Sequence, residues 1–305
     1  MQLSKNDFVA AAGYLRSKAR PLEAALFEYE FGVGSAEAAV QALAAFQNPD
    51  GGFGNGLEPD IRLGSSSVIA TAIAFSHFRA LGLPPDHQLV KTACAYLKAQ
   101  YLADEKRWRI MPANIDDAAH APWWTVGGDL WHSRVNPTAE ILGLLYEYPD
   151  HFDAALREEL ASELTAFLDA HDNVMEMHDL LCYVALVENP AVPEQLKAKL
   201  MGKLRQVADK TVERSPEQWP NYTIPPLAII NTPGSPFIDL FSAELPQNFA
   251  FMLSWRGTDG AWHPNWQWGD SETWNVVERE WSGILTLNNL RKLRSFGMIG
   301  DGERG

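Results

Sequence analysis

Residues 43–53 read LAAFQNPDGGF, and residues 253–262 read LSWRGTDGAW. Both stretches contain the end of a helix-like segment, a short polar turn, an Asp-Gly step, a small residue and an aromatic ring. The Asp-Gly step favours a tight turn because glycine tolerates a positive φ. Residues 97–108, LKAQYLADEKRW, keep the glutamine and the aromatic ring but lack the glycine. This repetition predicts a fold that is built from helical hairpins.

The rest of the chain also has helical periodicity and little of the alternation that is typical of strands. We therefore predict an all-α protein, with helices over residues 6–18, 35–47, 66–81, 86–101, 136–148, 153–170, 173–188, 193–211 and 276–296. Ser35 is placed to cap the helix that follows it, and Gly82 to end another. The long connections are rich in Gly, Pro, Trp, Asn and Asp, which predicts ordered loops at one end of the helices, over residues 48–64, 102–135, 214–236 and 256–275.

The composition is that of a globular protein, because 46% of the 305 residues are hydrophobic and 21% are charged. We expect a single domain over residues 1–298 and a flexible tail over residues 299–305. Cys94 and Cys182 lie in apolar stretches and are expected to be reduced thiols of a cytoplasmic protein. The amino terminus lacks the long uncharged core of a signal peptide, since Lys5 interrupts it.

Charge and hydropathy exclude several classes of partner. The formal net charge of -14 disfavours nucleic acids and anionic membrane surfaces as partners, because both bind to positively charged protein surfaces. No stretch approaches the ~18 apolar residues of a membrane span, so no integral membrane segment is expected. The remaining expectation is a small-molecule partner, either apolar or a sugar.

Tryptophan is the compositional outlier. The chain has 11 tryptophans, none of them before residue 108, and five lie between residues 255 and 274. Indole rings beside Gly, Pro and Asn are typical of a structural corner or of a cleft lining. The candidate substrate-binding residues are therefore Trp123, Trp124, Trp262, Trp266 and Trp268, together with Asn55.

A helix that ends in glutamine, followed shortly by Gly-x-aromatic, resembles the QW-type repeat of squalene and hopene cyclases and of the protein prenyltransferase β-subunit. Gln47 to Phe53 carry the resemblance best, and Arg256 to Trp262 carry it less closely. Three further blocks are similar to motifs of bacterial prenyltransferase or squalene-oxidase repeat proteins of unknown function: GGFGNGLEPD (51–60), HAPWW (120–124) and WHPNWQWGD (262–270). The resemblance implies an α/α-toroid, in which inner and outer helices surround an apolar cavity that takes an isoprenoid-type substrate.

The sequence Asn114-Ile115-Asp116-Asp117 is similar to the Asp-x-Asp-Asp motif of class II terpene cyclases. The middle Asp of that motif protonates an alkene or an epoxide. The resemblance gives this role to Asp116, with Asp117 as its neighbour, although Asn114 replaces the first carboxyl. Such an acid must stay protonated, so burial and neighbouring carboxyls must raise its pKa. The alternative is a capping or loop-surface pair of aspartates.

Two more groups complete the candidate catalytic residues. Glu58 and Asp60 flank Pro59 and could act as acid and base, could bind a cation, or could accept backbone N–H groups in a tight loop. His120 precedes two tryptophans and could be a general base or a satisfied structural group.

Neither a cofactor nor a metal ion is expected. The chain has no P-loop, no GxGxxG after a strand, no GxSxG and no HExxH. The Asp-x-Cys pair that holds zinc in the prenyltransferase β-subunit is absent. Asp179 and Cys182 lie on one helical face, but two ligands do not make a zinc site.

Three functions are compatible with these residues. The first is binding or acid-initiated cyclisation of an isoprenoid-type substrate, a cyclase-, isomerase- or transferase-like activity, with Asp116 as the acid. The rings that stabilise positive charge would be Trp123, Trp124 and Trp266.

The second function is that of a carbohydrate-active α/α-toroid hydrolase or lyase, whose paired carboxylates would come from Glu58, Asp60, Asp116 and Glu140. The third is a non-catalytic binding module, which a cavity wall without free carboxylates would favour.

Overall fold

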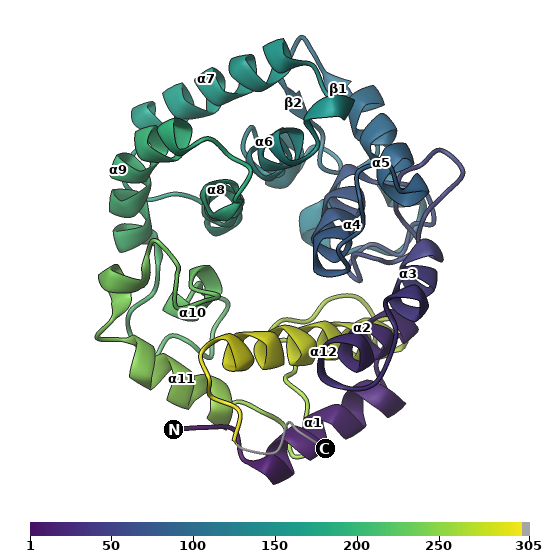
Figure 1. The fold of residues 1–305 in the computed structure, drawn as a ribbon, viewed down its shortest axis with the longest axis vertical. Helices are drawn as coiled ribbons and strands as arrows, with labels where there is room; N and C mark the ends of the chain where they lie inside the picture. Colours follow the sequence, from purple (N-terminus) through teal and green to yellow (C-terminus); the bar gives the residue numbers. More distant parts are fainter. Residues whose placement is uncertain (301–305) are drawn as a thin grey trace. The chain divides into compact units, whose positions relative to one another are not determined.

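A computed structural model of the chain describes residues 1–300, and this part is mostly helical (Figure 1). It divides into two compact units. The terminal unit contains residues 1–43 and the described residues from 212 onward, and the middle unit contains residues 44–211. A single domain over 1–298 and the α/α-toroid arrangement stay predictions, so each unit is described by itself.

The middle unit consists of helical hairpins with one short strand pair. Its helices are α4 (Val68–Ala80), α5 (Gln88–Ala99), α6 (Thr138–Glu147), α7 (Ala154–Ala170), α8 (Met177–Glu188) and α9 (Glu194–Thr211). Helix α6 packs against α7 and α8, and α9 packs against the same two helices. The long connections contain short 3-10 helices η1 (Ile115–Asp117), η2 (Pro122–Trp124), η3 (Asp129–His132) and η4 (Pro149–His151). The antiparallel strands are β1 (Tyr101–Leu102) and β2 (Arg107–Trp108).

The terminal unit joins the first and last helices of the chain. Its elements are α1 (Lys5–Ser17), α2 (Pro21–Phe31), α3 (Ala36–Ala44), α10 (Pro226–Ile229), η5 (Ile238–Phe241), α11 (Leu245–Ser254) and α12 (Ser271–Ser295). Helix α12, yellow in Figure 1, packs against α1 and α2, while α10 packs against α11. Ile299 pairs with Leu3, and the Gly300 N–H donates to the Leu3 carbonyl at 3.1 Å. The rest of the predicted tail, residues 301–305, lies outside the described residues.

Most predicted helices are confirmed to within a few residues at each end. Ser35 accepts the Ala38 N–H at 3.3 Å, and Gly82 has a φ of 63°, so both predicted caps are confirmed. Three helices were missed: α2, α10 and α11. The predicted start of α12 is five residues late. The helix begins at Ser271, because Asp270 caps it there by accepting the Thr273 N–H at 2.8 Å. Helix α2 was missed because its apolar residues do not form one stripe along the helix, although Pro21 is favourable at the first helical position.

The predicted repeat corresponds to a repeated hydrogen-bond pattern. In the middle unit, the Phe53 N–H donates to Oγ1 of Thr71 at 2.9 Å. In the terminal unit, the Trp262 N–H donates to Oγ1 of Thr286 at 3.1 Å. Each turn therefore ends on an aromatic residue whose backbone is bound by a threonine of the following helix.

The third, glycine-free copy follows the same pattern. The Trp108 N–H lies 3.4 Å from Oγ1 of Thr138, and its indole N–H donates to the Leu97 carbonyl at 2.6 Å. The indole of Trp262 likewise donates to the Met252 carbonyl at 2.7 Å. The ring folds back onto the preceding helix in both copies, which confirms the internal repeat.

Candidate functional site

The predicted catalytic residues lie in two loops of the middle unit that meet. Ile61 forms an antiparallel bridge with His120. The Arg62 N–H donates to the Ala119 carbonyl at 2.9 Å, and the Ala121 N–H donates to the Asp60 carbonyl at 2.9 Å. These contacts bring the loop of Glu58 and Asp60 beside the loop of His120.

Glu58 and Asp60 are both buried, with 6% and 3% exposure. Oε1 of Glu58 accepts the Asp60 N–H at 3.2 Å. Arg62 donates to the carbonyl of Pro59, the residue between them, at 3.2 Å. The Glu58 carboxylate thus accepts a backbone N–H of a tight loop, which is the structural alternative to an acid–base role.

Asp116 lies at the surface, with 56% of its side chain exposed, and Asp117 is also exposed. Oδ1 of Asp116 is 3.3 Å from Nε2 of His120, and Nδ1 of His120 is 2.9 Å from the Ala118 carbonyl. An acid that protonates an alkene needs burial to stay protonated, and Asp116 does not have that burial. His120 therefore links Asp116 to the backbone of Ala118 within this turn.

Three of the predicted substrate-binding residues also lie in the middle unit. Trp123 is half-buried and Trp124 is buried. The Trp124 indole nitrogen is buried and has no hydrogen-bond partner among residues 1–300. Asn55 has a φ of 55° and donates to Oδ1 of Asn48 at 3.1 Å, so it shapes a turn.

A tryptophan-lined pocket of about 270 Å³ lies within the terminal unit. The aromatic rings around it belong to Trp219, Phe251, Trp255, Trp262 and Trp266. We call it the tryptophan pocket. Of the residues predicted to bind a substrate, Trp262 and Trp266 line it, and Trp268 does not. Trp268 is buried and packs against Trp274, with ring centroids 6.5 Å apart.

Helices α11 and α12 form the long walls of the tryptophan pocket. Helix α11 and the residue that ends it contribute four lining residues at positions i, i+3, i+4 and i+7, which lie on one face of a helix: Asn248, Phe251, Met252 and Trp255. Helix α12 contributes Leu285, Asn289 and Lys292 at the same kind of spacing. The sequence did not predict α11, so the Asn248 and Phe251 contributions were missed. The apolar-and-amide spacing within 248–255 was the signal that could have found them.

Trp266 contacts two further aromatic rings where it lines the tryptophan pocket. Its ring packs edge-on against Trp281 at 5.3 Å and against Tyr222 at 5.7 Å between centroids. Its indole nitrogen is buried and has no hydrogen-bond partner within residues 1–300. The loop before it is held by Asn265, whose amide donates to the Asn221 carbonyl at 2.8 Å.

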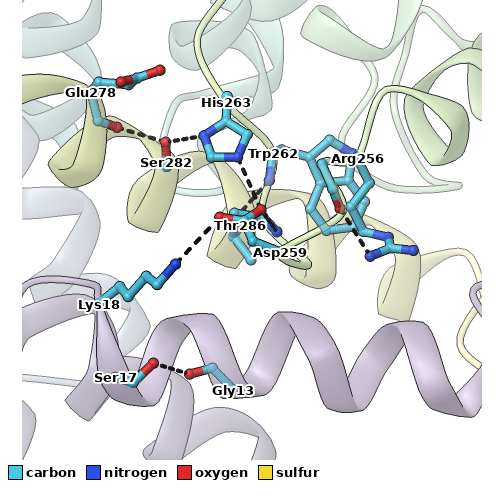
Figure 2. Close-up of polar contacts among 12 residues, drawn as sticks. Gly13, Ser17, Lys18, Arg256, Asp259, Trp262, His263, Glu278, Ser282 and Thr286 are labelled. Carbon is cyan, nitrogen blue, oxygen red and sulfur yellow. Dashed lines mark hydrogen bonds and ion pairs between the residues drawn. The ribbon is translucent and has the colours of Figure 1, made fainter. Parts of the chain in front are cut away.

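One side of the tryptophan pocket borders a Ser-His-Asp group, shown in Figure 2. Nδ1 of His263 is 2.9 Å from Oγ of Ser282, and Nε2 is 3.1 Å from Oδ1 of Asp259. Ser282 is fully buried, and its hydroxyl donates to the Glu278 carbonyl at 2.6 Å. A nucleophile must reach its substrate, so this group is a structural latch between the turn and α12 rather than a catalytic triad.

The electrostatics of this latch favour an ionised Asp259. Burial raises the pKa of the Asp259 carboxyl, but hydrogen bonds from His263 and from the Ala261 N–H outweigh burial, and the pKa is lowered overall. Lys18 adds a positive charge 3.8 Å away. Burial raises the pKa of the neighbouring Tyr14.

Two acids whose pKa values are raised lie on α6 and α8 in the middle unit, and both act electrostatically on Cys182 of α8. Burial raises the pKa of the Glu140 carboxyl and raises that of Asp179 to about 6. Oδ1 of Asp179 accepts a hydrogen bond from Oγ of Ser133 at 2.9 Å. Burial also raises the pKa of the Cys182 thiol. Within residues 1–300, no three His, Cys, Asp or Glu side chains are grouped so that they could hold a metal ion.

Comparisons with known proteins give no further assignment. A scan against models of protein families and searches of curated proteins and of solved structures found no match to this chain. In the described part of the chain, the longest and most apolar helices still fall short of what a membrane span requires.

Proposed function

We propose that this chain binds a small, apolar, isoprenoid-type ligand in the tryptophan pocket of the terminal unit. The observation that carries the proposal is the lining. Five aromatic rings surround the space, and none of the described residues that line it is an aspartate or a glutamate. A pocket lined by aromatic rings with a few amides suits a ligand that is held by burial of apolar surface.

The size of the pocket supports a short ligand. Its volume of about 270 Å³ lies just below the usual range of roughly 300–1,000 Å³ for drug-sized ligands. Burying about 200 Å² of apolar ligand surface would stabilise a complex by about 5 kcal/mol, before the loss of ligand freedom is subtracted. Because about 5 kcal/mol corresponds to a dissociation constant of about 0.2 mM, we expect an affinity in the millimolar range.

The same lining favours binding over acid-initiated cyclisation. Cyclisation needs a protonated carboxyl beside the substrate. The carboxyl that was predicted for this role, Asp116, is exposed and belongs to the other unit. We therefore propose a binding protein rather than a cyclase.

One observation favours a second candidate function, an acid–base site of the carbohydrate-active kind in the middle unit. Its residues would be Glu140 and Asp179, whose pKa values are both raised by burial. A raised pKa is what a general acid of a glycosidase needs. A panel of reducing-end-labelled oligosaccharides would test it, because turnover by the wild type and its loss in Glu140→Gln are both required.

We also propose the α/α-toroid as the arrangement of the hairpins and a cytoplasmic location. The three turns that end in an aromatic residue support the toroid, because the same junction occurs twice in the middle unit and once in the terminal unit. A crystal structure in which the hairpins do not close into a ring would overturn this proposal.

The binding function is tested by calorimetric titration of the full chain with geraniol, a neutral ten-carbon isoprenoid alcohol. We expect saturable binding to the wild type. Trp255→Ala should weaken binding about tenfold, because Trp255 lines the pocket and is 42% exposed, so its removal spares the fold. Trp123→Ala, at a half-buried tryptophan of the middle unit, is the matched control and should bind geraniol like the wild type. Absence of binding to the wild type, or equal loss in both variants, would overturn the proposal.

A further inference from the structure

The lining of the tryptophan pocket includes one polar side chain that is almost completely buried, that of Asn248 on α11. Asn248 is 1% exposed, and it lines the pocket. Its Oδ1 accepts the backbone N–H of Leu227 at 2.8 Å. A backbone N–H can only donate, so this contact determines which end of the Asn248 amide is the oxygen and which is the nitrogen.

The amide nitrogen of Asn248 is a donor without an acceptor. It carries two N–H groups, and neither of them donates a hydrogen bond to any of residues 1–300. Buried amide N–H groups are paired in most proteins, because an unpaired one costs free energy. Since Asn248 is buried and lines the pocket, a molecule in the pocket can supply the acceptor.

A second amide lies nearby on α12. Nζ of Lys292 donates to the Leu227 carbonyl, so this part of α12 and Asn248 contact the same residue. Asn289 lies three residues before Lys292, on the same face of the helix and about 4.5 Å along its axis. Asn289 is half-buried and lines the pocket, and its side chain makes no hydrogen bond with the rest of the described chain. Each long wall of the pocket therefore contributes an amide near Leu227.

Other polar groups of the lining are already paired within the protein. The Trp219 indole N–H donates to the Glu213 carbonyl at 2.8 Å, and the Trp262 indole N–H donates to the Met252 carbonyl at 2.7 Å. Both ring nitrogens of His263 are held in the latch that is described above. These groups do not offer a hydrogen bond to a ligand, whereas the two asparagines do.

From this arrangement we infer that the ligand of the tryptophan pocket is an oxygenated isoprenoid, whose oxygen accepts a hydrogen bond from Nδ2 of Asn248. Asn289 adds a second hydrogen bond to the same oxygen, and the hydrocarbon part lies against the indole rings. The inference rests on the proposed binding function, and it names the class of ligand and the residue that selects it. No covalent step is involved.

The selectivity follows from what each kind of ligand does to the Asn248 amide. A hydrocarbon of the same shape would cover the N–H groups without pairing them, and this loss weakens its binding. An alcohol or an ether brings an oxygen that accepts from the amide. A site that hydrogen-bonds its ligand therefore rejects an analogue without the polar group more strongly than a purely apolar site does.

The test compares three probes that share the ten-carbon chain of geraniol. They are geraniol, its methyl ether, and the hydrocarbon in which hydrogen replaces the hydroxyl. Weak-affinity chromatography over the immobilised full chain measures them, because it needs only traces of sparingly soluble probes. Retention on a column of the Trp255→Ala variant is subtracted, which leaves the part that depends on the pocket. Geraniol and the ether should each be retained about tenfold more strongly than the hydrocarbon.

A variant of Asn248 connects this preference to the amide nitrogen. Asn248→Asp keeps an oxygen for the Leu227 N–H and replaces the nitrogen with a second oxygen. At about pH 8 the new carboxylate can only accept, so geraniol can still donate to it through its hydroxyl and the ether cannot. Retention of the ether should therefore fall about tenfold relative to that of geraniol.

Variants of α12 provide a matched pair. Asn289→Leu removes no hydrogen bond within the described residues and should weaken retention of the ether about threefold or more, with retention of the hydrocarbon unchanged or increased. Asn288→Leu is the control, because Asn288 is the exposed neighbour of Asn289 and does not line the pocket. Thermal unfolding verifies that each variant is folded. If Asn248→Asp is not, the probe ranking and the Asn289→Leu variant decide.

Each outcome has a defined meaning. If the wild type retains the hydrocarbon as strongly as geraniol, the inference about the oxygen is overturned while the proposed binding function stands. Retention of the ether at the level of the hydrocarbon would also overturn it, because the oxygen would then not act as an acceptor. Equal effects of Asn289→Leu and Asn288→Leu would have the same meaning. If none of the probes is retained beyond the Trp255→Ala column, both the inference and the proposed function are removed.

Discussion

The backbone N–H of Trp262 lies 3.1 Å from Oγ1 of Thr286, a fully buried threonine of α12. A buried backbone N–H needs an acceptor, and the threonine hydroxyl supplies it here. The same relationship joins Phe53 to Thr71, which is also fully buried. A threonine hydroxyl therefore fixes the end of each aromatic turn to the helix that follows it.

Replacing this hydroxyl should destabilise the protein. Thr286→Val keeps the shape of the side chain but leaves the Trp262 N–H unsatisfied, which costs about 1–3 kcal/mol of the free energy of unfolding. Thr286→Ser keeps the hydroxyl and should retain most of the stability. Urea denaturation followed by far-UV circular dichroism measures both variants. Equal loss of stability in the two would show that the methyl group, and not the hydrogen bond, is what matters.

Two tryptophans of the pocket should respond differently to removal of the indole nitrogen. Trp262→Phe deletes the hydrogen bond to the Met252 carbonyl at 2.7 Å, whereas Trp266→Phe deletes an N–H that has no partner among the described residues. Both variants lose the same ring atoms, so their difference reports the hydrogen bond together with the deeper burial of Trp262. Trp262→Phe should be less stable than Trp266→Phe by about 1–2 kcal/mol in urea titrations. The prediction fails if Trp266→Phe proves the less stable of the two.

The latch of Asp259 and His263 should make stability depend on pH in a defined direction. The Asp259 pKa is lowered in the folded chain, so its ionised form stabilises the fold above the pKa of the unfolded chain. This contribution is lost as the pH falls through the folded pKa. Asp259→Asn should therefore be less stable than the wild type near neutral pH, and the gap should narrow in acid as the pH falls below the unfolded pKa of about 3.9 and through the lower folded pKa. A gap that stays constant between these conditions would rule out the charge as its cause.

The fold was predictable where local pattern determines it. The Asp-Gly turns and their aromatic rings were identified because a tight turn needs residues that allow a positive φ, and Gly51 and Gly260 have φ of 86° and 94°. Even the glycine-free copy at Trp108 was found. Helix α11 was missed because Pro246 follows its first residue and a run of turns precedes it, which obscures the start of the apolar pattern.

The candidate site was less predictable, because it depends on residues that are distant in sequence. The tryptophans at 262 and 266 were identified from composition alone. Asn248 and Lys292, which line the same pocket, were not identified. The spacing of residues within a helix indicates which of them share a face, but it does not indicate which faces of α11 and α12 meet. The sequence also did not show whether Asp116 is buried, and the structure places this carboxyl at the surface. Glu140 was identified as a candidate carboxylate, but its raised pKa depends on packing that the sequence does not show.

Glu140 should make the opposite contribution to that of Asp259. Burial raises its pKa in the folded chain, so its neutral form is favoured, and the stability that it contributes at low pH is lost as the pH rises through the folded pKa. Glu140→Gln carries a neutral side chain of nearly the same shape. The variant should be more stable than the wild type at about pH 8, and this advantage should disappear below about pH 4, where the carboxyl is protonated in both states.

Glu163→Gln is the matched control, because Glu163 is an exposed glutamate of the same unit whose pKa is lowered by its hydrogen bond to Lys106. Its ionised form stabilises the fold above the unfolded pKa, so this variant should be slightly less stable than the wild type in mild alkali and equal to it in acid. Chemical denaturation at about pH 4, 6 and 8 measures both variants, and the two substitutions should move stability in opposite directions. If Glu140→Gln is destabilised in mild alkali to the same degree as in acid, the carboxyl of Glu140 is not held neutral by burial, and the acid–base candidate in the middle unit loses its support.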